Sequence, residues 1–276
     1  MRELILKLKE ARAAGTEIML VTIVDHSGSV PRETGARMAV AKDGRIAGTI
    51  GGGILEHKCI LTAMEALSEK KSFQEHFALH PDSVADLGMI CGGEVEVAFR
   101  YLAAKDTAWE DVIRELEASV RPGHVYIFGG GHVAQQLVPI LTRCDFSCVV
   151  VEDRSDFADP ALFEYKAKTV VLPMEELEQF AKTITARDFV CVMTRGHQND
   201  YEVQRAILKT PARYIGVIGS RTKIAGVRER LKGDGFTEED LARIIAPIGI
   251  PIGSQTPAEI AVSVAAQLIK ECSEGH

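Results

Sequence analysis

The second half of the chain alternates short β-branched runs with helical stretches, and this alternation constrains the fold more than any other feature. From residue 123 onwards, segments with helical periodicity separate "HVYIF", "SCVVVED", "KTVVLP", "DFVCVMT" and "RYIGVIGS". Short apolar strands joined by helices indicate a parallel sheet that is covered on both faces. We therefore expect a doubly wound α/β domain over residues 121–276.

A glycine-rich turn follows the first of these runs. Residues 129–134, "GGGHVA", have the spacing Gly-x-Gly-x-x-Ala between a strand and a helix, which is the context of the dinucleotide fingerprint. The acidic residues that end the second run stand where such folds bind ribose hydroxyls. The residues expected to bind a nucleotide or another phosphorylated ligand are Gly129, Gly131, His132, Glu152 and Asp153. The alternative is that the turn is only a tight strand-to-helix connection.

Two later loops, "TRGHQND" and "GSRTK", follow the fourth and fifth runs. Because the carboxyl ends of parallel strands meet at one edge of a sheet, we expect both loops to line one crevice. The residues that would supply cationic, polar and acid–base groups there are Arg195, His197, Asp200, Ser220, Arg221 and Lys223. The competing interpretation is solvated loop charges, with Ser220 or Thr222 capping a helix. The sequence offers no paired nucleophile and base that would name a reaction.

The first 120 residues have a different pattern. "EIMLVTIVD" and "EVEVAFRYL" are candidate strands, "AVAKDGRIAG" has the pattern of a hairpin through Asp43-Gly44, and one clear helix follows it. We expect a mixed α+β domain over residues 1–120. Arg121-Pro122-Gly123 is the expected boundary with the second domain.

A second glycine turn, Gly51-Gly52-Gly53, lies between a strand and the helix of this first domain. Free amides at the start of a helix bind anions, and the nearby turn-rich segment adds Arg32 and Arg37. The sequence therefore predicts an anion pocket here. The alternative is a connection that uses glycine because it needs positive φ.

The stretch "GMICGGEVEV" places Cys91 in a glycine turn before a strand. A thiol beside backbone donors, with Arg32 or Arg37 near it, has a lowered pKa and acts as a nucleophile, a sulfur carrier or a soft-metal ligand. The alternative is a small apolar residue at a bulge. The six cysteines form no Cys-x-x-Cys pair and no zinc-type spacing, so we expect reduced thiols.

Charge and hydropathy exclude several classes of protein. A formal net charge of −7 disfavours a nucleic-acid binder, because phosphate neutralisation needs clustered positive charge. No apolar run is long enough to cross a bilayer, so we expect no membrane insertion. The N-terminal "MRELILKLKEARAAG" indicates an amphipathic helix and lacks the features of a signal peptide, which favours a cytoplasmic protein.

Seven unrelated motifs in the same chain resemble the XdhC/CoxI family, the xanthine dehydrogenase accessory factors. They are "VDHSGSVPRETGARMAV", "GTIGGGILEH", "GMICGGEVEV", "YIFGGGHVAQ", "TRGHQND", "YIGVIGSRTK" and "IGIPIGSQTPAEIAVSVAAQLI". The resemblance implies a Rossmann-like C-terminal domain preceded by an XdhC/CoxI domain, in a cytoplasmic homodimer. It also implies a chaperone that binds molybdopterin while a cysteine desulfurase supplies the sulfido ligand. The chaperone then delivers the cofactor to an apo molybdenum hydroxylase.

In the light of this resemblance, Cys91 is the candidate contact to molybdenum or to its sulfur. The two glycine turns, residues 51–53 and 129–131, become candidate sites for the pterin phosphate or for the nucleotide of a cytosine dinucleotide form. We expect no xanthine dehydrogenase activity of the chain alone, which lacks iron–sulfur cysteine spacing. Two other functions stay open: an NAD(P)-dependent oxidoreductase that uses the Gly-x-Gly-x-x-Ala turn, and a sulfur-transfer enzyme that acts through Cys91.

Overall fold

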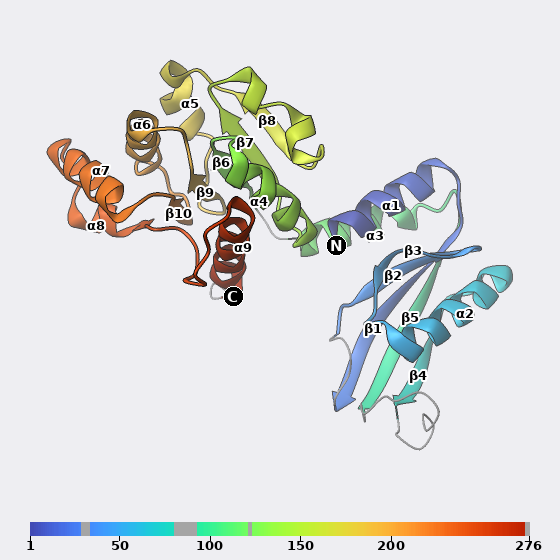
Figure 1. Cartoon of the computed structure of the whole chain (residues 1–276). Coiled ribbons are helices and arrows are strands. Elements are labelled where there is room, and N and C mark those ends of the chain that lie inside the picture. The colour runs from blue at the N-terminus through green and yellow to red at the C-terminus, as the bar shows by residue number, and fades with distance from the viewer. Residues whose placement is uncertain (29–33, 80–92, 121–122, 274–276) are drawn as a thin grey trace. The chain divides into compact units, whose positions relative to one another are not determined.

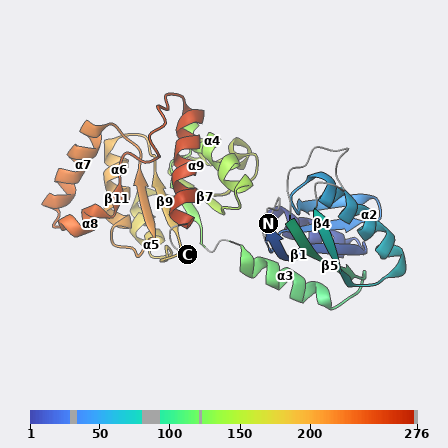
Figure 2. The same ribbon diagram turned by 90° about the horizontal axis from the view of Figure 1, so that it is seen from below.

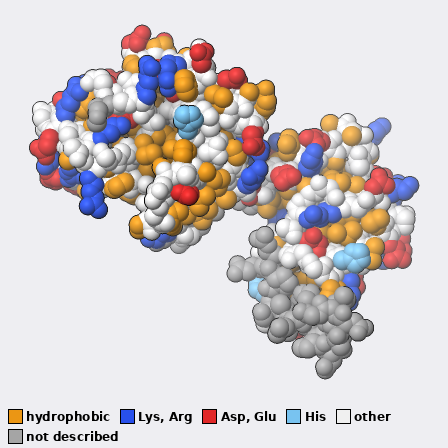
Figure 3. Space-filling view, viewed as in Figure 1, with side chains coloured by type: hydrophobic (Ala, Val, Ile, Leu, Met, Phe, Trp, Pro, Cys, Tyr) orange, Lys and Arg blue, Asp and Glu red, His pale blue; other side chains and the backbone are white. Residues whose placement is uncertain are grey.

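A computed structural model describes residues 1–28, 34–79, 93–120 and 123–273. The chain divides into two compact units, Met1–Val120 and Arg121–His276 (Figure 1). Among the described helices, none is both long and apolar enough to cross a bilayer. On the face in Figure 3, basic and acidic side chains are interspersed over the described parts of both units.

The N-terminal unit is built on a five-stranded antiparallel sheet with the order β3-β2-β1-β5-β4. The β2–β3 pair forms the expected hairpin, with Ala41 opposite Gly44. Its elements are α1 Arg2–Ala13, β1 Ile18–Gly28, β2 Arg37–Ala41, β3 Gly44–Thr49, α2 Gly53–Glu69, β4 Phe73–Leu79, β5 Gly93–Leu102 and α3 Ala108–Ser119. The expectation of antiparallel strands mixed with helices is confirmed.

Both faces of this sheet are packed against helices, because successive buried residues of β1 point to opposite faces. Met19 and Val21 pack with apolar residues of α2, whereas Ile18 and Leu20 pack with those of α1 and α3. Trp109 of α3 is fully buried in the cluster that Ile18 and Leu20 form with α1 and α3. The strand therefore has apolar side chains on both faces in its first half, while its last residues, Asp25 to Gly28, are polar and partly or fully exposed.

The C-terminal unit contains a six-stranded parallel sheet with the order β11-β10-β9-β6-β7-β8. Its strands are β6 Val125–Phe128, β7 Cys148–Glu152, β8 Lys168–Val171, β9 Phe189–Val192, β10 Tyr214–Val217 and β11 Ile244–Ile245. Its helices are α4 His132–Arg143, α5 Leu177–Ala181, α6 His197–Ile207, α7 Arg221–Gly233, α8 Glu238–Ala242 and α9 Pro257–Ser273, with short 3₁₀ turns η2 Ser155–Phe157, η3 Pro160–Phe163 and η4 Met174–Glu176.

Helices cover both faces of this sheet, which confirms the doubly wound prediction. Val125 and Ile127 of β6 pack toward α4 and α9, which lie side by side in Figures 1 and 2. Tyr126 and Phe128, the alternate residues, pack with α5, α6, α7 and α8. Because successive side chains of a strand point to opposite faces, one continuous apolar run fills both cores.

The strand order places a topological switch point between β6 and β9. From β6 the chain moves to β7 and β8 on one side, then returns to β9 on the other side. In open α/β sheets, ligands bind outside the carboxyl ends of the strands at such a point. The two loops that flank it touch each other, because a Cβ on Gly129 would lie 2.4 Å from the carbonyl oxygen of Met193.

Candidate functional site

The glycine turn after β6 places three glycines in three different environments. Gly129 has φ +111°, and a Cβ on Gly130 would lie 1.9 Å from the carbonyl oxygen of Phe157, so both positions are restricted by neighbouring backbone. Gly131 differs, since a Cβ there would meet nothing within 4 Å. It is the N-cap of α4 and, as a glycine, has no side chain with which to cap this helix end. The first amides of α4 therefore start a helix at an open position, with His132 exposed beside them.

The carboxylate of Glu152, at the end of β7, binds this turn directly. One oxygen accepts hydrogen bonds from the Gly130 amide at 2.9 Å and the Nη2 of Arg154 at 3.1 Å. The other accepts from the Nε of Arg154 at 2.9 Å and from its backbone amide at 3.3 Å. Glu152 is only 5% exposed. Its binding to ribose hydroxyls stays a prediction, and it would require that some of these bonds be exchanged.

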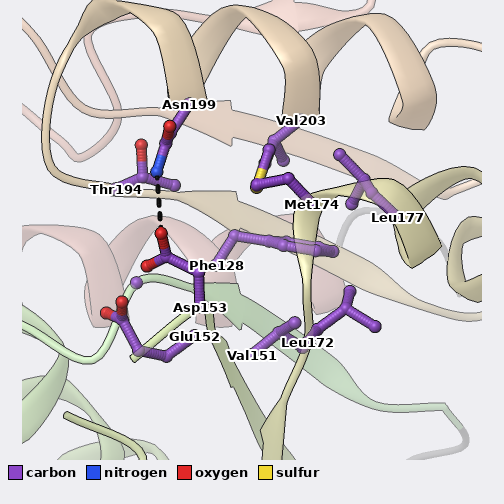
Figure 4. A pocket seen from close by; sticks show the side chains of 11 residues that line it. Phe128, Val151, Glu152, Asp153, Leu172, Met174, Leu177, Thr194, Asn199 and Val203 are labelled. Atoms are coloured by element: carbon purple, nitrogen blue, oxygen red, sulfur yellow. Dashed lines mark hydrogen bonds between the residues drawn. The ribbon is translucent and has the colours of Figure 1, made fainter. Parts of the chain in front are cut away.

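Asp153 faces the pocket at this edge of the sheet, as Figure 4 shows. Its carboxylate accepts a hydrogen bond from Asn199 of α6 at 3.4 Å and lies 3.9 Å from Arg195, whose side chain is 62% exposed. Apolar side chains complete the lining: Phe128, Val151, Leu172, Met174, Leu177 and Val203. The structure thus brings together Asp153 and Arg195, which the sequence analysis assigned to two different loops.

The two neighbouring carboxyls differ in acidity. Burial alone would raise the pKa of Glu152, but the hydrogen bonds from Arg154 and from the Gly130 amide, together with the charge of Arg154, outweigh burial and lower it. The neighbouring carboxylate of Glu152, together with burial, raises the pKa of Asp153. Asp153 is therefore the member of the pair that takes up a proton first as the pH falls.

Asp200, on the first turn of α6, is fully buried and holds the loop after β9. One of its oxygens accepts from the amide of Thr194 at 3.2 Å and from its hydroxyl at 2.5 Å, and the other forms an ion pair with Lys223. These contacts connect the loops after β9 and β10. The expected meeting of Asp200 and Lys223 at one edge is therefore observed, and their contact is an ion pair within the protein.

The structure describes the remaining predicted residues of this edge to different extents. Ser220 caps α7 by accepting a hydrogen bond from the Lys223 amide at 3.3 Å, as the competing interpretation expected. Arg221 is exposed beside it. His197 is the first residue of α6, but its side chain is not among those that the structure describes.

The sequence analysis missed three residues of this edge: Arg154, Thr194 and Asn199. The available signal for Arg154 was its position directly after Glu152-Asp153, where a basic residue can pair with the carboxylates.

The glycine turn of the N-terminal unit contains its own carboxylate. One oxygen of Glu56, on α2, accepts from the hydroxyl of Thr49 and from the amides of Ile50 and Gly52, both at 3.0 Å. Its other oxygen lies 3.3 Å from a guanidinium nitrogen of Arg45. The predicted anion pocket over residues 51–53 therefore holds an internal anion in this structure, and its occupation by a ligand stays a prediction.

We expect Glu56 to make stability depend on pH. Burial would raise its pKa, but bonds from Thr49 and from the amides of Gly52 and Ile50 lower it overall. A carboxyl with a lowered folded-state pKa contributes stability that is present above the unfolded value of about 4.3 and is lost as the pH falls through the folded value. Between pH 3 and 7, the unfolding temperature of the wild type should exceed that of Glu56→Gln, and this difference should shrink below about pH 4. Glu65→Gln, which alters an exposed residue of the same helix, is the control; an advantage independent of pH would contradict this expectation.

Cys91 and Arg32 lie outside the described residues, so their roles stay predictions. Arg37, the other arginine considered near them, forms an ion pair with Glu115. The described cysteines include Cys59, where burial raises the thiol pKa to about 12. Within the described ranges, no three His, Cys, Asp or Glu side chains are grouped as metal ligands.

Comparisons with known proteins match both units. A family model described as the XdhC Rossmann domain matches residues 125–268, and a model of the XdhC and CoxI family matches residues 11–78. The chain is 30% identical over 251 residues to uncharacterized protein YqeB of Escherichia coli K12; the match covers 91% of this chain and 43% of YqeB. The chain thus spans less than half the length of that relative.

A second relative and a solved structure match at lower identity. The molybdenum cofactor insertion chaperone PaoD of Escherichia coli K12 is 24% identical over 278 residues, which cover 94% of this chain and 85% of PaoD. A crystal structure described as a xanthine dehydrogenase from Bacillus halodurans superimposes with a TM-score of 0.82 at 22% identity, covering 99% of this chain and 96% of that chain. At this identity, the superposition establishes a common fold.

Proposed function

Because this chain belongs to the XdhC and CoxI family, we propose that it is a chaperone that binds the molybdenum cofactor and passes it to a molybdenum hydroxylase. The cofactor is cargo in this proposal, so the protein needs reversible binding and a docking surface rather than a catalytic centre. The observation that carries the proposal is the similarity to PaoD, which extends over 94% of this chain and therefore over both units.

The open start of α4 suits the phosphate of such a cargo. Gly131 leaves space at the amides of the first helical turn, and these amides attract a phosphate through hydrogen bonds and the helix dipole. We propose that Gly129 shapes this turn and that the exposed Arg195 adds positive charge at the neighbouring loop. His132, His197 and Arg221 are further candidate contacts at the same edge.

We propose that Cys91 contacts the molybdenum centre or its sulfur, with Arg32 favouring the thiolate. The cargo is molybdopterin or its cytosine dinucleotide form. A cysteine desulfurase would supply the sulfido ligand to the bound cofactor, and an apo molybdenum hydroxylase would then receive it. We expect the protein to act as a homodimer in the cytoplasm, and to have no xanthine dehydrogenase activity alone.

An NAD(P)-dependent oxidoreductase is the competing function, and the observation in its favour is the strand order with a Gly-x-Gly-x-x-Ala turn at the switch point. The bonds that already occupy Glu152 count against it. Titration with NADH separates the two functions. Saturable micromolar binding with hydride transfer to a carbonyl substrate would replace the chaperone proposal.

Transfer of the cofactor tests the proposal. The protein is purified from a host that makes molybdopterin and is mixed with a cofactor-free xanthine dehydrogenase-type hydroxylase. We expect hydroxylase activity to appear, and to stay absent when the protein comes from a host unable to make molybdopterin. Equal activation by both preparations, or by neither, would contradict a carrier role.

A further inference from the structure

We propose that Arg154 is a positioning residue that closes the adenosine half of the dinucleotide site in the C-terminal unit. It does so by holding the carboxylate of Glu152 on the amide of Gly130. The inference concerns which ligands this unit rejects. It does not depend on the identity of the cargo proposed above.

The acceptor capacity of Glu152 is already filled. An ionised carboxylate offers about four lone-pair positions. Four donors occupy them: the amide of Gly130, and the Nε, Nη2 and backbone amide of Arg154. In a dinucleotide-binding domain, the acidic residue at this strand end accepts hydrogen bonds from ribose hydroxyls. Here a ribose could bind Glu152 only by displacing Arg154, a charged donor in a bidentate pair.

The segment that carries Arg154 also packs onto the glycine turn. The carbonyl oxygen of Phe157, at the end of η2, is so close to Gly130 that a Cβ on this glycine would lie only 1.9 Å from it. The guanidinium of Arg154 lies 3.7 Å from the ring centre of Phe157, within the range of a cation–π contact. The ring therefore holds Arg154 in the position from which it binds Glu152, and Gly130 is glycine because the chain itself approaches it closely.

The pocket lined by Glu152 and Asp153 has little room. Its cavity volume is about 20 Å³, which is space for one or two water-sized spheres. Asp153, the other acidic residue at this strand end, already bonds Asn199 and lies near Arg195. An adenosine would thus have to open the pocket and displace Arg154. Because only the open fraction of the molecules can bind, the apparent affinity of such a site is lower than that of a site that is already open.

ADP-ribose tests the inference, because it contains the adenosine, ribose and pyrophosphate of NAD without the nicotinamide. Isothermal titration of the full chain should show no saturable binding up to ~1 mM. Arg154→Ala frees acceptor positions on Glu152, and we expect its affinity for ADP-ribose to exceed that of the wild type by at least roughly tenfold. A gain of binding is informative because loss of a merely structural arginine would weaken binding or leave it unchanged.

Arg228→Ala is the matched control, since Arg228 also pairs with a carboxylate, that of Glu238, but lies on α7. It should bind ADP-ribose as poorly as the wild type. Wild-type binding in the micromolar range, or no gain in Arg154→Ala, would overturn the inference. If Arg154→Ala does not fold, Arg154→Lys, which keeps the charge but loses the bidentate geometry, replaces it with the same expected direction. None of these results depends on the pterin content, so the inference and the chaperone proposal can fail separately.

Discussion

A Gly130→Ala variant is expected to lose about 3 kcal/mol of folding stability in the C-terminal unit. The added Cβ would lie 1.9 Å from the carbonyl oxygen of Phe157 and 3.0 Å from its carbonyl carbon. Backbone cannot move away as a flexible side chain can, so either the turn or η2 must shift. The shift would also strain the hydrogen bond from the Gly130 amide to Glu152. For a unit of this size the loss corresponds to a fall in the unfolding temperature of about 10 °C, measurable by calorimetry.

Gly131→Ala is the control for this prediction. It adds the same methyl group one residue later, where nothing lies within 4 Å, and its cost should stay below about 1 kcal/mol because it only replaces glycine at an N-cap. Equal destabilisation by the two variants would contradict the packing described for the turn. Ligand binding should respond in the opposite order, because the methyl group of Gly131→Ala enters the space proposed for the phosphate.

The second large effect is expected for Cys91→Ser. If the thiolate contacts the molybdenum centre or its sulfur, a hydroxyl cannot replace it, because soft thiolate ligands bind such centres and alcohols do not. Co-production of the variant with a molybdenum hydroxylase should lower the specific activity and the cyanide-labile sulfur of the hydroxylase on the order of tenfold or more. Both quantities can be measured on the purified hydroxylase.

Cys144→Ser is the matched control, since Cys144 is a partly buried thiol at the end of α4. It should leave the activity and the sulfur content of the hydroxylase unchanged. Normal sulfur and normal activity with Cys91→Ser would remove Cys91 from the proposal, while the carrier role could still be tested by transfer of the cofactor.

The fold of the C-terminal unit could be predicted because local sequence determines it. Apolar runs such as "SCVVVED" fill both faces of a parallel sheet, and glycine marks the turn after β6. The edge on which Asp200 and Lys223 meet also follows from topology alone, because both residues lie in the first turns of the helices that follow the neighbouring strands β9 and β10.

The partners of the buried carboxylates could not be predicted in this way. Glu152 was expected to face a ligand, yet it bonds an amide 22 residues earlier in the chain. Glu56 likewise folds back onto Ile50 and Gly52. Spacing places a carboxyl at a strand end or on a helix turn, but competition among nearby donors decides which atoms it bonds. A glycine turn can therefore satisfy the anion motif with an internal carboxylate as well as with a ligand.

The most direct test of the chaperone proposal is the molybdenum and pterin content of the purified protein. The protein should be prepared from a host that makes the cofactor, with metal measured by elemental analysis and pterin by the fluorescence of its oxidised form. We expect near-stoichiometric pterin in the wild type and clearly less in Cys91→Ala. Absence of pterin from both, under conditions that load a known carrier, would contradict the proposal.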